Sequence, residues 1–195
     1  MVADSSDTAE WRIETVSADE EGCLFYLDHY KPFRLMALQQ DPDGCPLAKT
    51  FAAGQSRDKT VLSATSLLGP LPDSQPASNP SQVIAEMSEG DDRHDCQDAA
   101  PMCFQMASVY TRSEARGRGL AKRLVKVAMD DAVKQAQERG RALSLSFVVY
   151  ATNTAAIAFY ESCGFVASAE GPTDSFNPLK NSTSGELNMF FRAAS

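Results

Sequence analysis

The stretch Phe104-Gln105-Met106-Ala107-Ser108-Val109-Tyr110-Thr111, with the segment that follows it to Gly140, decides the fold of this chain. Its β-branched and aromatic residues predict a strand over 104–111. Over 120–139, apolar residues recur at i, i+3, i+4 and i+7, which predicts a helix with one buried face that ends at Gly140. Between them lies the basic turn Arg116-Gly117-Arg118-Gly119. Such a turn suits a phosphate group, because glycines allow close approach and the first N–H groups of a helix lack helical partners.

That turn alone fits an ordinary solvated helix start equally well. It has neither the G-x-G-x-x-G pattern of dinucleotide-binding proteins nor the G-K-[ST] ending of a P-loop. A second pattern lies downstream, where a predicted strand at 143–150 is followed by Asn153-Thr154-Ala155-Ala156-Ile157-Ala158-Phe159-Tyr160-Glu161-Ser162-Cys163-Gly164-Phe165. The two patterns in this order and spacing are far more specific than either one.

Both patterns resemble signatures of one superfamily, the GCN5-related N-acetyltransferases (GNAT). Residues 116–121 are similar to R/Q-x-x-G-x-G/A, and residues 153–165 are similar to N-x-x-A-x-x-x-Y-x-x-x-G-F. The resemblance is clear over residues 102–166 and looser outside them. It implies an acyl-CoA N-acyltransferase with an α/β fold, in which helices flank a mixed sheet of about seven strands.

We expect a single GNAT-like domain over 11–195, preceded by a flexible tail at 1–10. Residues 69–101 carry several prolines and an acidic run without periodicity, which predicts a long loop. A helical segment is expected over 17–40, with an interruption near Pro32. The pattern also predicts a polar loop at 171–185 and further strands at 11–16, 50–54, 60–68, 166–170 and 186–192.

Charge and cysteine content narrow the class of protein. The net charge of −8 argues against a nucleic-acid partner, which needs a basic face. No apolar run approaches the roughly eighteen residues of a membrane span, and the polar, acidic N-terminus does not resemble a signal peptide. The five cysteines show no CxxC pairing and no metal-ligand spacing. We therefore expect free thiols, no metal site, no membrane partner and a cytoplasmic location.

The resemblance implies acetyl-CoA as the cosubstrate, bound where the fourth and fifth strands of the fold splay apart. The N–H of Val109 would polarise the thioester carbonyl, as an oxyanion-hole donor does. The pyrophosphate would rest on N–H groups of the basic turn, and Asn153 would hydrogen-bond the cofactor arm. The implied cofactor-binding residues are Val109, Tyr110, Thr111, Arg116, Gly117, Arg118, Gly119, Leu120, Ala121, Lys122, Asn153, Ala156 and Phe159.

Tyr160 is the candidate general acid of the signature. Attack of an amine on the thioester expels a thiolate, and a phenol with a pKa of about 10 can return a proton to a thiol with a pKa of about 8.5. From spacing alone, the favoured interpretation of Tyr160 is a core residue that packs beside Ile157 and Phe159. The signature favours the acid.

The general base is left unassigned. Histone-type members of the superfamily use a glutamate on the central strand, and here Gln105 stands at that position, where an amide cannot accept the proton. Glu114 lies in the basic turn and is expected to be solvated. Water relayed from Ser108, Tyr110 or Tyr150, or a carboxylate of the long loop such as Glu86, remains open.

The sequence thus predicts an N-acetyltransferase that uses acetyl-CoA to modify a primary amine of a small molecule. A protein or peptide acceptor is an alternative within the same chemistry. A non-catalytic acyl-CoA-binding domain is a second alternative, which Gln105 favours and Tyr160 and Asn153 oppose. The terminal strand with Phe190 and Phe191 leaves a homodimer open.

Overall fold

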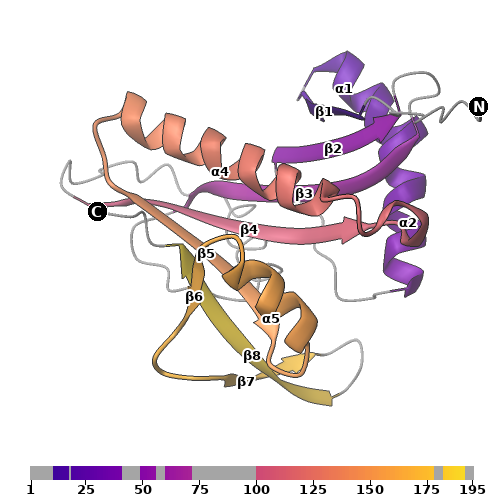
Figure 1. Cartoon of the computed structure of the whole chain (residues 1–195). Helices are drawn as coiled ribbons and strands as arrows, with labels where there is room; N and C mark the ends of the chain where they lie inside the picture. The colour runs from indigo at the N-terminus through magenta and orange to yellow at the C-terminus, as the bar shows by residue number, and fades with distance from the viewer. Residues whose placement is uncertain are drawn as a thin grey trace, which may run out of the picture.

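The computed structural model describes residues 11–17, 19–40, 49–55, 60–71, 100–177 and 182–191. They form a mixed α/β structure around one eight-stranded sheet in the order β1-β2-β3-β4-β5-β8-β6, with β7 paired to β8 (Figure 1). This confirms the expected fold class. The strands are β1 (Trp11–Thr15), β2 (Lys49–Gln55), β3 (Val61–Leu71), β4 (Met102–Thr111), β5 (Leu143–Tyr150), β6 (Phe165–Ala167), β7 (Thr173–Asn177) and β8 (Ser182–Phe191).

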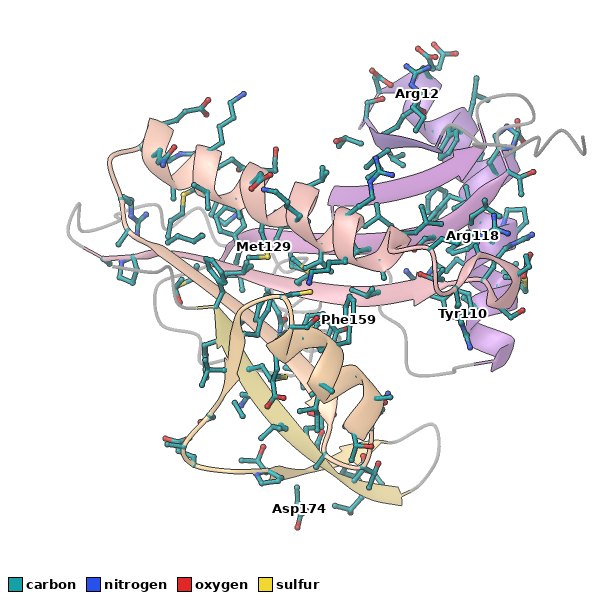
Figure 2. All side chains as sticks on the ribbon, viewed as in Figure 1. Arg12, Tyr110, Arg118, Met129, Phe159 and Asp174 are labelled. Carbon is teal, nitrogen blue, oxygen red and sulfur yellow. The ribbon has the colours of Figure 1, made fainter. Side chains whose placement is uncertain are left out.

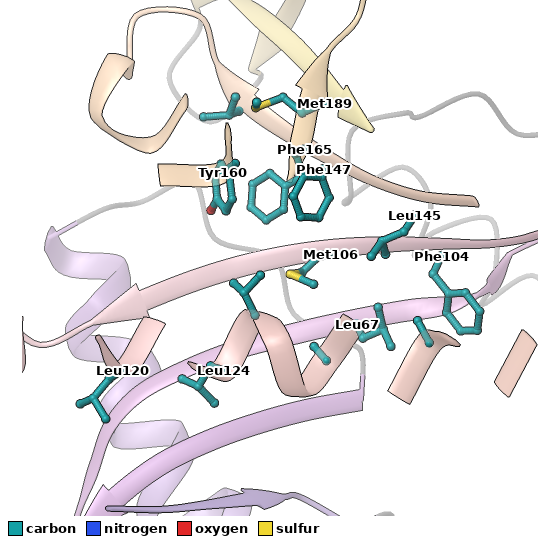
Figure 3. Packing of buried hydrophobic residues seen from close by; sticks show 14 of the residues in the cluster. Leu67, Phe104, Met106, Leu120, Leu124, Leu145, Phe147, Tyr160, Phe165 and Met189 are labelled. Atoms are coloured by element: carbon teal, nitrogen blue, oxygen red, sulfur yellow. The ribbon is translucent and has the colours of Figure 1, made fainter. Parts of the chain in front are cut away.

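Two helical layers cover the two faces of this sheet (Figure 1). On one face, α4 (Leu120–Glu138) and α5 (Thr154–Glu161) close the main core. On the other face, helical residues 20–40 bury Tyr30 and Phe33 against Val61 and Ala64 of β3. Figure 3 shows the main core, which includes Leu67, Phe104, Met106, Leu120, Leu124, Leu145, Phe147, Tyr160, Phe165 and Met189.

The N-terminal helical segment is continuous, although the sequence predicted an interruption near Pro32. It consists of α1 (Glu20–Phe25), a π-helical turn (Tyr26–Tyr30) and α2 (Lys31–Gln40). The N–H of Lys31 donates to the carbonyl of Tyr26, five residues back. The wider turn falls just before Pro32, where a proline ring would otherwise crowd a regular α-helix.

Residues 173–177 form a strand, whereas the sequence predicted a loop throughout 171–185. This strand, β7, pairs antiparallel with the start of β8, from Thr173 opposite Glu186 to Asn177 opposite Ser182. Its side chains are mostly polar, so hydrophobic patterning carried no signal, and backbone pairing supplies the strand. The expected tail at 1–10 and most of the expected loop, residues 72–99, lie outside the described residues.

The parallel pair β4 and β5 separates part-way along its length. Pairing runs from Met102 opposite Leu143 to Met106 opposite Phe147. Beyond that point, β4 continues beside β3 and β5 continues beside β8, so a gap opens between them (Figure 1). Ser108 adopts a left-handed φ of 56° where the β3–β4 register shifts, which marks a bulge in β4. This splay is the one that the resemblance implied.

Candidate active site

One side of the gap between β4 and β5 is the edge of β4. Among the described residues, no strand pairs with this edge. Residues 107–111 of β4 pair with β3 on one side and with no described strand on the other. The Val109 side chain packs on the main core, and Tyr110 packs on the opposite face, where its ring lies 5.6 Å from that of Phe33. An extended ligand arm can pair with such an edge as an added strand does.

The turn before α4 has the geometry that the sequence predicted for an anion site. Gly117 and Gly119 both have φ of 74°, a conformation that strains other residues. Gly119 is the N-cap of α4, and no side chain caps this end of the helix. The first turn of α4 also contains no acidic residue. Exposed basic residues surround it instead, namely Arg118, Lys122 and Arg123. Cations at a helix N-terminus oppose its dipole, so a bound anion would relieve an unfavourable arrangement.

Arg116 has a different role from its neighbours in the turn. Its Nε donates a hydrogen bond of 3.0 Å to the backbone carbonyl of Thr111, at the end of β4. Its guanidinium carbon lies 6.0 Å from the centre of the Tyr110 ring. The Arg116 side chain therefore links the basic turn to the end of β4. Figure 2 shows Tyr110 and Arg118 together at this end of β4.

Asn153 begins α5 on the other side of the gap. Its Oδ1 accepts a hydrogen bond of 3.1 Å from the N–H of Ala156, which makes Asn153 the N-cap of the helix. Ala156 and Phe159 are half-buried against the main core. The amide NH₂ of Asn153 is the part of its side chain that this cap does not use.

Tyr160 lies on the buried face of α5 and is 5% exposed. Its ring centre is 3.9 Å from that of Phe147 and 6.2 Å from that of Phe165. Figure 3 shows its hydroxyl end turned towards the β4 side of this cluster. The aromatic packing fixes the phenol on the α5 side of the gap.

The surroundings of Gln105 and Glu114 disfavour both residues as a general base. Gln105 is 0% exposed and lies where β4 is still paired on both sides, opposite Leu68 and Ser146. Hydrogen bonds from its own backbone N–H and from Ser113, together with the charge of Arg112, lower the pKa of the exposed Glu114 carboxyl. A carboxylate of lowered pKa accepts a proton poorly near neutral pH.

Comparison with known proteins finds one family model that matches part of this chain. Residues 83–165 match the model described as the Acetyltransferase (GNAT) family. No curated protein sequence matches the chain.

Solved structures agree with the GNAT fold. The NatC complex bound to Gag peptide and CoA has a TM-score of 0.52 at 16% identity, covering 95% of this chain and 99% of that one. The ribosomal-protein-S18-alanine N-acetyltransferase from Escherichia coli has a TM-score of 0.53 at 14% identity, covering 95% and 97%. A protein provisionally described as a phosphinothricin N-acetyltransferase has a TM-score of 0.53 at 12% identity, covering 95% and 100%. At these identities the likeness shows the fold.

A cavity lies away from the predicted site residues. An open cavity of about 650 Å³ between β1 and α1 is lined by residues such as Arg12, Glu21 and His29, and by none of the predicted site residues. Within the described residues, no three metal-ligating side chains cluster, and no helix is both long and apolar enough to cross a membrane.

Proposed function

We propose that this protein is an acyl-CoA-dependent N-acetyltransferase that moves the acetyl group of acetyl-CoA to a primary amine by direct attack. The observation that carries this proposal is the gap between β4 and β5 beside the uncapped, basic start of α4. The GNAT family match supports the enzyme class, and the CoA in the NatC structure supports the cosubstrate.

In this proposal the cofactor arm lies along the open edge of β4, with the N–H of Val109 directed at the thioester oxygen. Loss of one such donor typically costs about a hundredfold in rate. The pyrophosphate rests on the N–H groups at residues 117–122, where the glycines and the helix start converge. The NH₂ of Asn153 donates to the cofactor arm.

Tyr160 acts as the general acid. When the amine nitrogen bonds to the acetyl carbon, the carbon–sulfur bond breaks and the departing thiolate takes the phenolic proton. The position of Tyr160 supports this role, because the ring contacts with Phe147, Phe159 and Phe165 hold the phenol on the α5 side of the gap.

The acceptor is proposed to be a small-molecule primary amine, and a protein or peptide amine is the second candidate. The phosphinothricin-type structure favours the first, while the NatC and ribosomal-protein structures favour the second. A cytoplasmic location is also proposed, since Cys23, Cys103 and Cys163 are free thiols.

The test is thiol release from acetyl-CoA across a panel of small amines, amino acids and peptides, with Tyr160→Phe assayed beside the natural chain. Turnover on one amine class, reduced about a hundredfold by the substitution with CoA affinity kept, supports both the enzyme and its acid. Full turnover by Tyr160→Phe would remove Tyr160 from the mechanism. CoA binding without turnover on any acceptor would favour the non-catalytic alternative.

A further inference from the structure

The acceptor must reach the gap from the face of the sheet opposite α5. Helices α4 and α5 and the basic turn all lie on one face, around the main core, and in the proposed function the cofactor enters from that side (Figure 1). Direct attack requires the amine to approach the thioester from elsewhere. The acceptor would therefore pass the side chains of β4, β5 and β8 that point away from α4 and α5.

The strand register places Tyr150 one residue from the level of the proposed thioester. The pairs of β4 with β5 run from Met102 opposite Leu143 to Met106 opposite Phe147 with a constant offset. The extra residue of the bulge at Ser108 changes this offset by one, so Val149 comes opposite Val109, the proposed oxyanion donor, and Tyr150 follows one position further along β5. Tyr150 is in turn paired with Glu186 of β8.

Both side chains point to the acceptor face. Their neighbours along the strands, Val149 and Leu187, are buried in the main core with α4 and α5. Because side chains alternate along a strand, Tyr150 and Glu186 project to the opposite face. Tyr110 from β4 also lies on that face, where it packs on Phe33. The mouth of the gap is thus flanked by two phenol rings and one carboxylate.

We infer that Glu186 binds the ammonium group of the acceptor beside Tyr150 and takes its proton. This inference rests on the proposed function and assigns the base that Gln105 and Glu114 do not supply. Glu186 is half-buried and is the only carboxylate on β4, β5 and β8 as the structure describes them. Its backbone is held by β7, since Thr173 lies opposite it and donates a side-chain hydrogen bond of 3.4 Å to its carbonyl. A carboxylate beside aromatic rings suits a primary ammonium group, through charge and cation–π attraction.

The proton balance closes with the residues at the gap. The ammonium nitrogen gives one proton to the Glu186 carboxylate, directly or through one water, and its freed electron pair bonds to the acetyl carbon. The carbon–sulfur bond breaks, the thiolate takes the proton of Tyr160, and the second proton that the nitrogen loses in becoming an amide restores the phenol of Tyr160. The substrate class is accordingly a primary amine that is cationic when it binds.

The experiment compares Glu186→Gln with the control Asp174→Asn, which removes an equal charge from the neighbouring strand. Asp174 lies opposite Gly185, one position from Glu186, and alternation directs it to the other face. Two acceptors are assayed, n-butylamine, which is cationic at neutral pH, and hydroxylamine, which is not. We expect Glu186→Gln to lower kcat/KM for n-butylamine about a hundredfold and for hydroxylamine much less, and to flatten the acid limb of the n-butylamine pH profile. Asp174→Asn should change neither.

Equal losses on both acceptors, or equal losses in both variants, would overturn the role of Glu186. If the natural chain acetylates neither amine and no other acceptor of the panel, the proposed function fails instead. In that case calorimetry of n-butylamine with the CoA complex still decides the ammonium site, because unchanged affinity in Glu186→Gln would reject it.

Discussion

At the scale of single residues, Arg116 shows why its position accepts either arginine or glutamine in the GNAT signature. The Nε of arginine and the amide nitrogen of glutamine both follow Cδ, so either can donate to the carbonyl of Thr111. Sequence reasoning found this residue but assigned its charge to the phosphate. A hydrogen bond to a carbonyl five residues back leaves no periodic pattern in the sequence. The bond between Arg116 and Thr111 is therefore seen only in the structure.

Arg116→Gln should therefore keep CoA affinity within about twofold, while Arg116→Met, of similar length but without a donor, should weaken it about tenfold. Calorimetric titration with CoA measures both variants, and Arg118→Gln serves as the control for losing one positive charge in the same turn. If Arg116→Gln binds CoA as weakly as Arg116→Met, charge at position 116 matters more than the hydrogen bond to Thr111.

Other residue-scale features were equally hidden in the sequence. The bulge at Ser108 depends on a left-handed φ that serine seldom adopts, so no residue pattern indicates it. In the sequence, Glu186 is only the first residue of the strand predicted at 186–192, and nothing there indicates a role for it. Its relation to Val109 depends on two strand registers, from β4 to β5 and from β5 to β8, which a single sequence does not specify.

At the scale of elements, α4 was predictable and β7 was not. Leu120, Leu124, Ala128 and Ala132 repeat along one helical face and are all buried, so periodicity alone defined the helix and its ends. β7 has mostly polar side chains and forms because β8 offers an edge to pair with. Patterning detects elements that bury one face and misses those held mainly by backbone pairing.

The start of α5 allows helix capping to be separated from cofactor binding. Asn153→Asp keeps an oxygen that can accept from the N–H of Ala156, but it removes the NH₂ donor proposed to meet the cofactor. Asn153→Ala removes both. We expect Asn153→Ala to lower the free energy of unfolding by about 1 kcal/mol and Asn153→Asp to leave it unchanged, while both weaken CoA binding. Urea unfolding and calorimetry measure the two effects, and unaltered CoA affinity in Asn153→Asp would restrict Asn153 to capping.

At the scale of the whole molecule, the two halves of the sheet diverge from the β4–β5 gap. The half containing β1 to β4 carries α1 and α2, and the half containing β5 to β8 carries α5 (Figure 1). The family resemblance predicted this plan because its two signatures flank the gap. The N-terminal helices and the C-terminal strands, where an acceptor would be recognised, lie outside those signatures, so the sequence left the acceptor undefined.

The C-terminal half also carries the surface on which a homodimer would form. Val166 of β6 and Phe190 of β8 are directly paired and are 47% and 36% exposed. Both alternate with core residues, Phe165 and Met189, so they share the opposite face of the sheet. A pair of exposed apolar side chains in register suits a symmetric contact with a second copy.

We expect the natural chain to sediment as a dimer and Phe190→Lys to sediment as a monomer, because a buried lysine at the contact would lack a partner charge. Phe190 lies four residues beyond Glu186 on β8, about 13 Å along the strand, so CoA affinity and turnover should persist in the variant. Thr183→Lys, on the exposed β7–β8 end of the same strand, controls for added charge. A natural chain that sediments as a monomer at tens of micromolar would refute the dimer, and a dimer that survives Phe190→Lys would place its interface on another surface.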